Sequence, residues 1–447
     1  MPRVRFPHTL TLLVGCILLA AALTYVVPAG EYQRRDDPAT GRSVVVSGTY
    51  ARVAAAPVTP FGALIAIPKG FAEAASVIAL VFLVGAAFAV VERVGTLGRL
   101  VEWLVARLAN RGTLVIPVAG VVFSLGGILM QTQEELIAFV PALLLLSRHL
   151  GFSPLAVVAM SIGTAAVGAA FSPVDPFQVL IAQRVAQLPP ASGAGFRIAF
   201  LVPAVIIWIW GTARHANRTR IPPSAAGNMA AARFRWQDLT ILGSIFLALG
   251  LYVYGAQHLD WEFDQLSAMF FAVGVLAGIL GRLGADGTAE AFVDGFRSMA
   301  YASLLIGFAR AIYVVLNEGK IVDTLVNGLF SPIAGLPAAL SAVGMMVAHV
   351  AVHVPVPSTS GHAVLTLPLL VPLSDLIGLS RQVTVLAYQY GAGLCDLLTP
   401  TNGALMAMLA AAGVRYDEWL RFTLPLFGIL LGLGALAIVV GAAMGLR

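Results

Sequence analysis

The sequence predicts an all-α polytopic membrane protein, formed by an inverted repeat with about nine transmembrane spans, two re-entrant helical hairpins and two broken helices. Two observations lead to this prediction. Of the 447 residues, 59% are hydrophobic and only 11% are charged. With a mean hydropathy of +0.89, the chain has too few charged side chains to cover a water-soluble protein of this size. The second observation is a polar segment that occurs twice, 227 residues apart (399 − 172 = 227).

The repeated segment is Ser172–Asp175 in the first half and Thr399–Asn402 in the second. Each copy holds a proline flanked by hydroxyl and by carboxyl or amide side chains, within a stretch that is otherwise apolar. Because proline and polar side chains that bond to the backbone interrupt helices, each copy predicts a helix break. The same offset pairs further residues: Thr132 with Thr359, Pro141 with Pro368, Gly151 with Gly378, and Ser153 with Ser380.

The chain is expected to form a single integral membrane domain, 1–447, because no hydrophilic stretch is long enough for another domain. It divides into a first repeat, 1–214, a basic cytoplasmic loop with a linking span, 215–258, and a second repeat, 265–447. The linking span makes the second repeat enter the membrane from the opposite face. The two repeats are therefore predicted to be inverted relative to each other.

Two apolar stretches with a polar tip are predicted to be re-entrant hairpins. In 114–150, the polar residues Gln131–Glu135 separate arms of about 15 residues, or ~22 Å of helix, which is too short for a ~30 Å hydrocarbon core. In 338–377, the tip is Pro357–His362. The helix breaks are expected near 168–176 and 395–403, within stretches too long for one span. The first hairpin is expected to open from the cytoplasm and the second from outside.

Uninterrupted apolar runs predict the remaining spans, at 10–27, 77–91, 197–212, 236–255, 266–283, 300–316 and 422–445. The loop 31–50 is expected to hold short strands, and the arginines of 93–111 predict an amphipathic surface helix. Arginines between Arg214 and Arg235 mark a cytoplasmic loop by the positive-inside rule. By this rule the N-terminus is predicted to lie in the cytoplasm, and the first span is expected to be retained rather than cleaved. The expected location of this multi-pass chain is a bacterial cytoplasmic (inner) membrane.

The hairpin tips are expected to bind the substrate. Carboxylates are costly at membrane depth, so Glu134 and Glu135 are candidates to bind a cation, a proton or a cationic substrate. The alternative is that they only cap the second hairpin arm. Candidate substrate-binding residues are Thr132, Gln133, Glu134, Glu135, Ser358, Thr359, Ser360 and His362.

The helix breaks are expected to bind the coupling ion, because side-chain and freed backbone oxygens are ligands for a small cation. Candidate ion-binding residues are Ser172, Asp175, Thr399, Thr401 and Asn402. The alternative is that these side chains only cap the half-helices that follow. The coupling ion is expected to be Na⁺ or H⁺, with no other cofactor, no metal beyond Na⁺ and no catalytic residue.

Other polar residues within apolar stretches have less certain roles. His349 and His353 lie one helical turn apart, but no Glu stands between them as in an HExxH motif. We interpret them as packing or pH-sensitive residues rather than metal ligands. Asp396, within the second break, is compatible with a place at the site. Arg310 is interpreted as one member of an interior or interfacial ion pair.

Three stretches resemble one transporter family: LTYVVPAGEYQR near the start, DPFQVLIAQRVA at the first break, and the run from HVPVPSTSGHAVLTLPLL to LTPTNG. They are similar to the YfcC-like branch of the DcuC (four-carbon dicarboxylate carrier) family, in the ion transporter superfamily that includes AbgT-type and INDY-type transporters. The resemblance implies a scaffold-and-hairpin fold and Na⁺- or H⁺-coupled secondary transport, sometimes by an elevator movement. Asp175 departs from the Asn that the family usually has before Pro-Phe.

The expected function is ion-coupled secondary active transport of a small carboxylate-bearing metabolite or amino acid. A basic amino acid antiporter or exchanger is the alternative, since Glu134, Glu135 and Asp175 favour a cationic or zwitterionic substrate. An intramembrane hydrolase using Ser358 or Ser360, or a channel, explains the duplicated hairpin and break less well. Expected partners are the substrate, the coupling ion and the lipid bilayer, with a homodimer left open and no nucleic acid.

Overall fold

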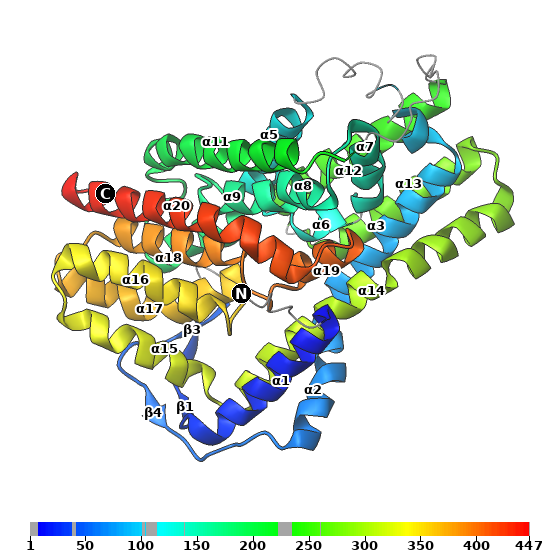
Figure 1. Ribbon diagram of the computed structural model, residues 1–447. Coiled ribbons are helices and arrows are strands. Elements are labelled where there is room, and N and C mark those ends of the chain that lie inside the picture. The colour runs from blue at the N-terminus through cyan, green and yellow to red at the C-terminus, as the bar shows by residue number, and fades with distance from the viewer. Residues whose placement is uncertain are drawn as a thin grey trace.

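The computed structural model is almost entirely helical, and the helices of the hairpins and breaks lie beside a group formed by α1 (Thr9–Val26), α2 (Pro60–Glu73), α3 (Ala75–Arg93), α13 (Phe263–Leu280) and α14 (Gly284–Glu318) (Figure 1). The structure describes residues 8–37, 42–100, 103, 114–137, 139–221, 235–259 and 261–446. In this part of the chain, the strands form only two antiparallel two-stranded ribbons. The all-α class predicted from the sequence is therefore confirmed.

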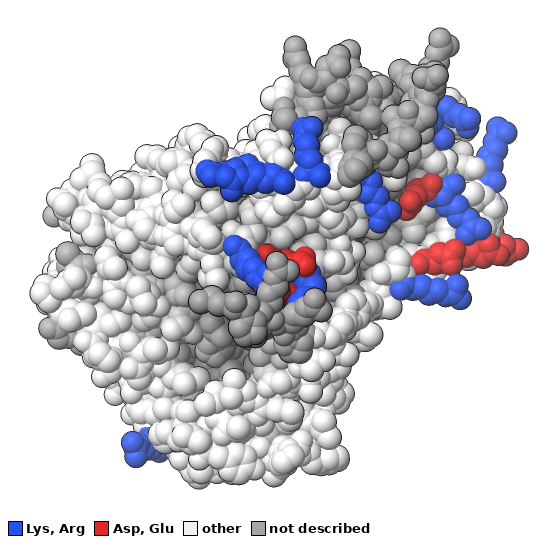
Figure 2. Space-filling view, in the orientation of Figure 1, with Lys and Arg blue, Asp and Glu red and all other residues white. Residues whose placement is uncertain are grey.

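Among the described residues, five helices are long and apolar enough to cross a membrane: α3 (Ala75–Arg93), α11 (Ala194–Arg218), α13 (Phe263–Leu280), α14 (Gly284–Glu318) and α20 (Tyr416–Ala443). Shorter apolar helices occupy most of the other predicted spans and hairpin arms. Charged side chains are sparse over the face shown in Figure 2, where they gather mainly toward one end. Such a surface suits a polytopic membrane protein, whose lateral faces contact lipid.

The N-terminal segment is one helix followed by the two ribbons. Helix α1 covers Thr9–Val26. Strand β1 (Gly30–Glu31) pairs with β4 (Ala51–Arg52), and β2 (Arg34–Asp37) pairs with β3 (Arg42–Val45). Short strands were predicted in this loop, and they are present.

The ribbons are fastened to helix α15 (Val322–Phe330) through the buried carboxylate of Asp323. Asp323 accepts hydrogen bonds from the Tyr32 backbone N–H and from Arg34 Nη2, each at 2.9 Å. Burial, together with the neighbouring Asp323 carboxylate, raises the pKa of Tyr32 to about 12. The phenol therefore stays protonated and donates to Asn327 Oδ1 at 3.0 Å.

The first hairpin has the predicted polar tip. Its first arm is α5 (Val115–Met130), which ends at Gln131 in the left-handed conformation, φ 54°. The second arm was expected to be one helix, but it is divided into α6 (Glu134–Ile137) and α7 (Val140–Leu150). Pro141 lies in the first turn of α7. Since its ring excludes a helical hydrogen bond to the preceding turn, the arm is interrupted there.

The second hairpin consists of α16 (Ala338–His353) and α17 (Thr359–Leu376). Ser358 begins α17 as its N-cap, because its hydroxyl accepts a hydrogen bond from the Gly361 backbone N–H. Helix α17 continues through two internal prolines, Pro368 and Pro372. The non-helical tip comprises residues 354–358, so four residues of the predicted tip, Thr359 to His362, instead form the first turn of α17.

Both predicted helix breaks are present. The elements before the first break are α8 (Pro154–Val158), η2 (Ala159–Gly163) and α9 (Thr164–Ala170), and those after it are η3 (Pro176–Leu180) and α10 (Ile181–Val185). The second break separates α18 (Arg381–Cys395) from α19 (Gly403–Ala411).

The hairpins and the broken helices pack in a reciprocal pattern. Within each half, the first hairpin arm packs on the first part of the broken helix, α5 on α9 and α16 on α18. Between the halves, α9 packs on α18, while α10 and η3 pack on α17, and α19 packs on α6 and α7. Each half-helix that follows a break therefore contacts the hairpin of the other half. This exchange brings tips and breaks together.

Helices α11 and α20 pack on each other and on the hairpins and broken helices. A second body consists of α1, α2 (Pro60–Glu73), α3, α12 (Trp236–His258), α13 and α14, in which α14 packs on α1, α2 and α3, and α13 packs on α3 and α12. Helix α14 has 35 residues, so it extends well beyond the predicted span 300–316. Its N-terminal part carries Asp286, Glu290, Asp294 and Arg297. Because these residues are charged, this part of the helix was not included in the predicted apolar span. Of the predicted surface helix at 93–111, residues 96–100 are helical, whereas 101, 102 and 104–111 lie outside the described residues.

Candidate functional site

A cavity of about 340 Å³ lies where both hairpin tips meet the second break. The described residues that line it come from both sequence halves: Gln131, Gln133, Glu134, Phe177, Tyr252, Glu262, Phe263, Arg310, Pro357, Ser358, Thr359, Ser360, Asp396 and Asn402. Convergence of hairpins and a broken helix on one cavity is the arrangement expected of a secondary transporter.

Six residues predicted from the sequence line this cavity: Gln133, Glu134, Ser358, Thr359, Ser360 and Asn402. Six others are not among its described lining residues: Thr132, Ser172, Asp175, His362, Thr399 and Thr401. The Glu135 side chain lies outside the described part of the structure. For all thirteen, a binding role stays a prediction.

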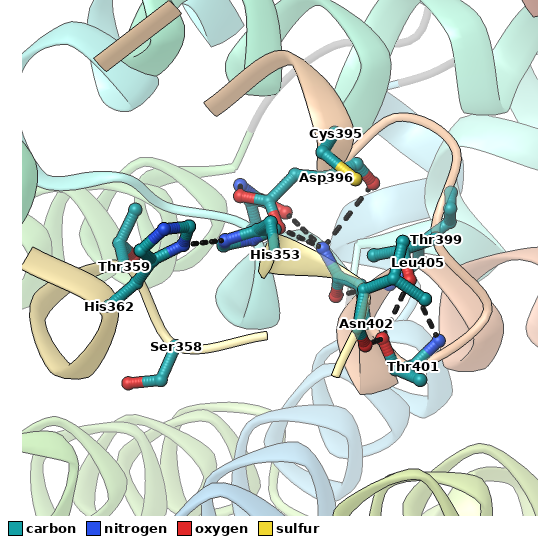
Figure 3. A network of polar contacts seen from close by, with 12 residues as sticks. His353, Ser358, Thr359, His362, Cys395, Asp396, Thr399, Thr401, Asn402 and Leu405 are labelled. Carbon is teal, nitrogen blue, oxygen red and sulfur yellow. Dashed lines mark hydrogen bonds and ion pairs between the residues drawn. The ribbon is translucent and has the colours of Figure 1, made fainter. Parts of the chain in front are cut away.

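Asp396 is the hub of the polar contacts at the cavity. It directly follows α18, and only 6% of its surface is exposed. Its Oδ1 accepts from Asn402 Nδ2 at 3.0 Å and contacts His353 Nε2 at 2.9 Å. Its Oδ2 accepts from Gln133 Nε2 at 3.2 Å and from Gln131 Nε2 at 3.5 Å. A single carboxylate therefore connects the first tip with the second hairpin and the second break. Figure 3 shows Asp396 between His353 and Asn402.

The two hairpin tips also contact each other directly. Thr359 Oγ1 donates to Gln131 Oε1 at 3.0 Å, and the Tyr388 hydroxyl donates to the Thr359 backbone carbonyl at 2.6 Å. Gln131 can present its side chain to Thr359 because its left-handed conformation ends α5 and turns the chain. The cavity is thus enclosed partly by a contact between side chains 228 residues apart.

At the second break, Asn402 caps α19 and donates a hydrogen bond to Asp396. Its Oδ1 accepts from the Leu405 backbone N–H at 3.1 Å, and its Nδ2 donates to Asp396 Oδ1 and to Gln133 Oε1. Thr401 Oγ1 contacts Thr399 Oγ1 and donates to the Val354 carbonyl, both at 2.6 Å. The geometry of Asn402 is therefore that of a capping and positioning residue.

The first break has a different environment. Asp175 is fully buried, and its Oδ1 accepts from the backbone N–H groups of Phe177 and Gln178 at 2.8 and 2.7 Å. Its Oδ2 is buried without a hydrogen-bond partner. The Ser172 hydroxyl accepts from the Asp175 N–H and donates to the Ile128 carbonyl. Ser172 and Asp175 thus satisfy backbone groups of the break, as the capping alternative predicts.

Three histidines form a chain that ends at Asp396. A hydrogen bond joins His349 Nδ1 to His362 Nε2 at 2.8 Å, and another joins His362 Nδ1 to His353 Nδ1 at 3.1 Å. Figure 3 shows His362, His353 and Asp396 in succession, with Ser358 off to one side. His353 and His362 use both ring nitrogens within this chain, and His349 Nε2 has no partner. These contacts thus join the imidazoles to one another and to Asp396.

Sequence reasoning did not place Arg310 at the site, although a basic residue within an apolar stretch was a signal. Arg310 Nε donates to Glu73 Oε2 at 2.8 Å, and its guanidinium carbon lies 4.7 Å from the centre of the Tyr313 ring. Arg310 and Ser358 also line a second cavity, of about 230 Å³, toward Arg34 and Val45 of the N-terminal ribbon. Arg310 thus lies between two cavities on either side of the second tip.

Among the described residues, no group of three or more His, Cys, Asp or Glu has the arrangement of a metal site. Within the lining of the main cavity, three carboxylates (Glu134, Glu262 and Asp396) stand against one guanidinium, that of Arg310. The cavity is therefore acidic, with one basic residue from α14.

The chain matches the model of the C4-dicarboxylate anaerobic carrier family, DcuC, over residues 6–443. It is 29% identical over 493 residues to YfcC of Escherichia coli (strain K12), which bears the provisional name of a basic amino acid antiporter, covering 98% of this chain and 97% of that protein. It is 26% identical over 496 residues to an uncharacterized protein of Haemophilus influenzae (strain ATCC 51907 / DSM 11121 / KW20 / Rd), with the same coverage.

Two solved transporter structures are also similar. The YdaH transporter of Alcanivorax borkumensis aligns with a TM-score of 0.44 at 20% identity, covering 98% of this chain and 99% of that one. MtrF of Neisseria gonorrhoeae, described as illuminating a class of antimetabolite efflux pumps, aligns with a TM-score of 0.43 at 17% identity, covering 98% and 96%.

Proposed function

Because this chain belongs to the C4-dicarboxylate anaerobic carrier family, a family of membrane transporters, we propose that it is an ion-coupled secondary transporter of a small basic amino acid. Exchange of that amino acid for a coupling ion or for a second amino acid is the mode we propose. The location is a bacterial cytoplasmic membrane, with the N-terminus in the cytoplasm, as the basic loop near Arg214–Arg235 favours.

One observation carries the choice of substrate: the cavity holds Glu134, Glu262 and Asp396 opposite Arg310. Its volume of about 340 Å³ is at the lower end of the ~300–1,000 Å³ typical of small-molecule sites. A basic amino acid presents one carboxylate and two cationic groups. The carboxylate would pair with Arg310, and the cationic groups would pair with Glu134 and Asp396.

A four-carbon dicarboxylate, despite the family's name, fits this cavity less well. Its two carboxylates would face three lining carboxylates with one guanidinium to neutralise them. Like charges brought together in a partly buried site cost several kcal/mol (about 4 kcal/mol for two charges 4 Å apart at an effective dielectric of ~20). The provisional name of the Escherichia coli relative YfcC, a basic amino acid antiporter, supports the same choice.

The arrangement of tips and breaks supports coupled transport rather than a channel. Both hairpin tips and the second break contribute side chains to one cavity, so binding there engages segments of both halves. Transporters of this architecture alternate access by moving such segments around a central site. An open pore needs no such closed convergence.

The test is uptake by the purified full-length protein in proteoliposomes. Radiolabelled lysine, arginine, ornithine, succinate and fumarate are offered, with Na⁺ and pH gradients imposed separately. We expect accumulation of at least one basic amino acid under one of the gradients and none of the dicarboxylates. Accumulation of succinate or fumarate alone would overturn the substrate, and flux without accumulation under either gradient would overturn coupled transport.

A matched pair of variants connects this result to the cavity. Glu134→Gln removes a lining carboxylate and is expected to raise the apparent KM for lysine about tenfold or more, since a partly buried charge-assisted bond is worth about 1.5–3 kcal/mol. Asp286→Asn removes an exposed carboxylate in the first turn of α14 and is expected to change little. If Glu134→Gln transports like the wild type, Glu134 has a structural role.

A further inference from the structure

We propose that Asp396, His353, His362 and His349 together bind and relay one proton, which makes H⁺ the coupling ion and places it in competition with the cationic substrate at Asp396. The proposal rests on the proposed function for the identity of the competing ligand, but the proton relay itself stands on geometry. Its four side chains come from α16, α17 and the residue that follows α18.

The chain is continuous and shielded from solvent. The three contacts are 2.8 Å between His349 and His362, 3.1 Å between His362 and His353, and 2.9 Å between His353 and Asp396. The three histidines are 0% exposed, and Asp396 is 6% exposed. Each contact is a nitrogen–nitrogen or nitrogen–oxygen hydrogen bond, so a proton can pass along it without movement of the heavy atoms.

The direction of the hydrogen bonds follows from counting protons. A neutral imidazole has one N–H and one acceptor nitrogen. If Asp396 is ionised, His353 donates from Nε2, so its Nδ1 accepts from His362 Nδ1, and His362 Nε2 accepts from His349 Nδ1. This order leaves a lone pair on His349 Nε2. Among these four side chains, that nitrogen is the one atom that is buried without a hydrogen-bond partner.

Binding of one proton reverses the direction of all three hydrogen bonds between these side chains. When a proton binds His349 Nε2, the Nδ1 proton of His349 passes to His362, that of His362 passes to His353, and the Nε2 proton of His353 passes to Asp396. Each bond broken is matched by one formed, and no imidazolium is left. The net charge of the four groups changes from −1 to 0. The carboxylate that faces the cavity is therefore neutralised by a proton that entered at the opposite end of the chain.

The groups around the chain suit a neutral relay. His349 packs against the rings of Phe330 on α15 and Tyr388 on α18, and His362 also packs against Tyr388. Glu134 of the first tip, Glu262 and Arg310 line the same cavity as Asp396. An ammonium or guanidinium bound in the cavity would pair with the same carboxylate that receives the relayed proton.

Competition between one proton and one cationic substrate is sufficient for exchange. Substrate binding requires an ionised Asp396, whereas proton binding removes that charge. Asp396 also accepts hydrogen bonds from Gln133 and Asn402, so its charge state alters contacts of the first tip and the second break. Protonation of Asp396 can therefore change both the affinity for substrate and the strength of the contacts between the two halves.

The first experiment uses the wild-type protein and needs no substrate. Solid-state ¹⁵N NMR of histidine-labelled protein in lipid bilayers reports the tautomer of each imidazole, with single His→Gln variants for assignment. Between about pH 9 and about pH 4, we expect His349 and His362 to change together from Nδ1–H to Nε2–H, and His353 from Nε2–H to Nδ1–H. Separate transitions, an imidazolium at any of the three, or unchanged tautomers would overturn the relay.

The second experiment measures proton movement. Proteoliposomes with a trapped pH indicator are driven by a lysine gradient, and H⁺ per lysine is measured for the wild type, His349→Gln and His215→Gln. His215, which packs against Phe422, is outside the relay. We expect His349→Gln to retain lysine–lysine exchange within about threefold but to lose at least about tenfold in H⁺ per lysine, with His215→Gln unchanged.

The outcomes separate this proposal from the proposed function. If the wild type moves no basic amino acid, the proposed function fails while the tautomer titration still decides the relay. If lysine exchange occurs and His349→Gln keeps its full proton coupling, the relay fails and the proposed function stands. His362→Gln serves in the same assay if His349→Gln does not fold, because it interrupts the chain at its middle.

Discussion

Asp175 and Asn402 occupy the same position of the two sequence halves, and both side chains cap the half-helix that follows the break. The two breaks nevertheless differ in what surrounds them. At the first break, Asp175 and Ser172 bond to backbone groups and are absent from the described lining of the cavity. At the second break, Asn402 holds a neighbouring carboxylate, Asp396, toward the cavity and the first hairpin tip.

The chemistry of the second break has no counterpart in the first. At the offset of 227 residues, Asp396 corresponds to Ala169, His353 to Gly126, His349 to Val122, and His362 to Glu135. The capping side chains that shape the backbone are thus shared, whereas the carboxylate and the histidines occur once. The side chains on which the proton relay depends therefore belong to the second break and its hairpin.

The largest expected effect distinguishes the two breaks directly. Asp396→Asn should reduce transport about a hundredfold, because a buried, hydrogen-bonded charge is worth about 2–5 kcal/mol. The amide has one acceptor oxygen, while four donors surround the carboxylate of Asp396: His353, Asn402, Gln133 and Gln131. Initial rates of lysine uptake in proteoliposomes measure the loss.

The control for this prediction is Asp175→Asn. The amide keeps an oxygen for the backbone N–H groups of Phe177 and Gln178, and the other carboxylate oxygen has no partner to lose. We expect transport within about threefold of the wild type, since a capping Asn replaces a capping Asp at little cost. If the two variants are equally inactive, the breaks are equivalent in function and the contrast drawn between them is wrong.

In each half, a glycine of the broken helix lies against the first hairpin arm, although the 227-residue offset does not pair these two glycines. Gly168 on α9 packs against the backbone of Ser124 on α5, and Gly391 on α18 packs against the backbone of Met346 on α16. A methyl group at either position would meet a carbonyl oxygen of the hairpin arm. Gly168→Ala and Gly391→Ala should therefore each destabilise the protein by about 1–3 kcal/mol.

Thermal unfolding in detergent micelles checks this symmetry. Gly428→Ala on α20 is the matched control, because no atom lies within 4 Å of the added methyl group. Alanine is favoured over glycine by about 1 kcal/mol in an open helical position, so this variant should unfold at the same or a higher temperature. A large drop in the unfolding temperature for only one of the two tight glycines would show that the hairpins pack differently.

The sequence predicted the features that the two halves share, but not those that distinguish the two breaks. Thr132, Thr359, the tip residues and the prolines of the breaks identified both hairpins and both breaks, because each local signal is a polar or cyclic side chain in an apolar stretch. The sequence did not indicate which of the two breaks contributes side chains to the cavity. It depends on α19 packing on α6, α7 and α14, while α10 and η3 pack on α17.

The same reasoning explains the residues that were missed. Arg310 lies on α14, in the second body of helices, so its place at the cavity depends on how that body docks against the hairpin tips. His349 and His353 could be paired by their spacing along one helix. Their connection to His362 and Asp396 requires the fold of the second hairpin against α18, which no local pattern encodes.

A smaller effect is expected for Arg310 on α14, which lines the cavity together with Asp396 of the second break. Arg310→Gln should raise the apparent KM for lysine about tenfold, the equivalent of about 1.4 kcal/mol, by removing the partner of the substrate carboxylate. Cadaverine, which is lysine without that carboxylate, should compete equally well with both proteins. Glu73→Gln is the control for loss of the Arg310–Glu73 ion pair. Equal loss of lysine and cadaverine binding would assign Arg310 to structure.

The smallest expected effect concerns the two threonines that the repeat pairs, Thr132 and Thr359. Thr359 Oγ1 donates to Gln131 Oε1 across the tips and lines the cavity, whereas Thr132 is not among the described lining residues. Thr359→Val removes one neutral hydrogen bond, worth about 1 kcal/mol, and should lower the uptake rate about threefold to fivefold. Thr132→Val should change it less than twofold. Because valine preserves the shape of threonine, the difference isolates the hydroxyl. A larger effect at Thr132 than at Thr359 would mean that the first tip, rather than the contact between the tips, controls access to the cavity.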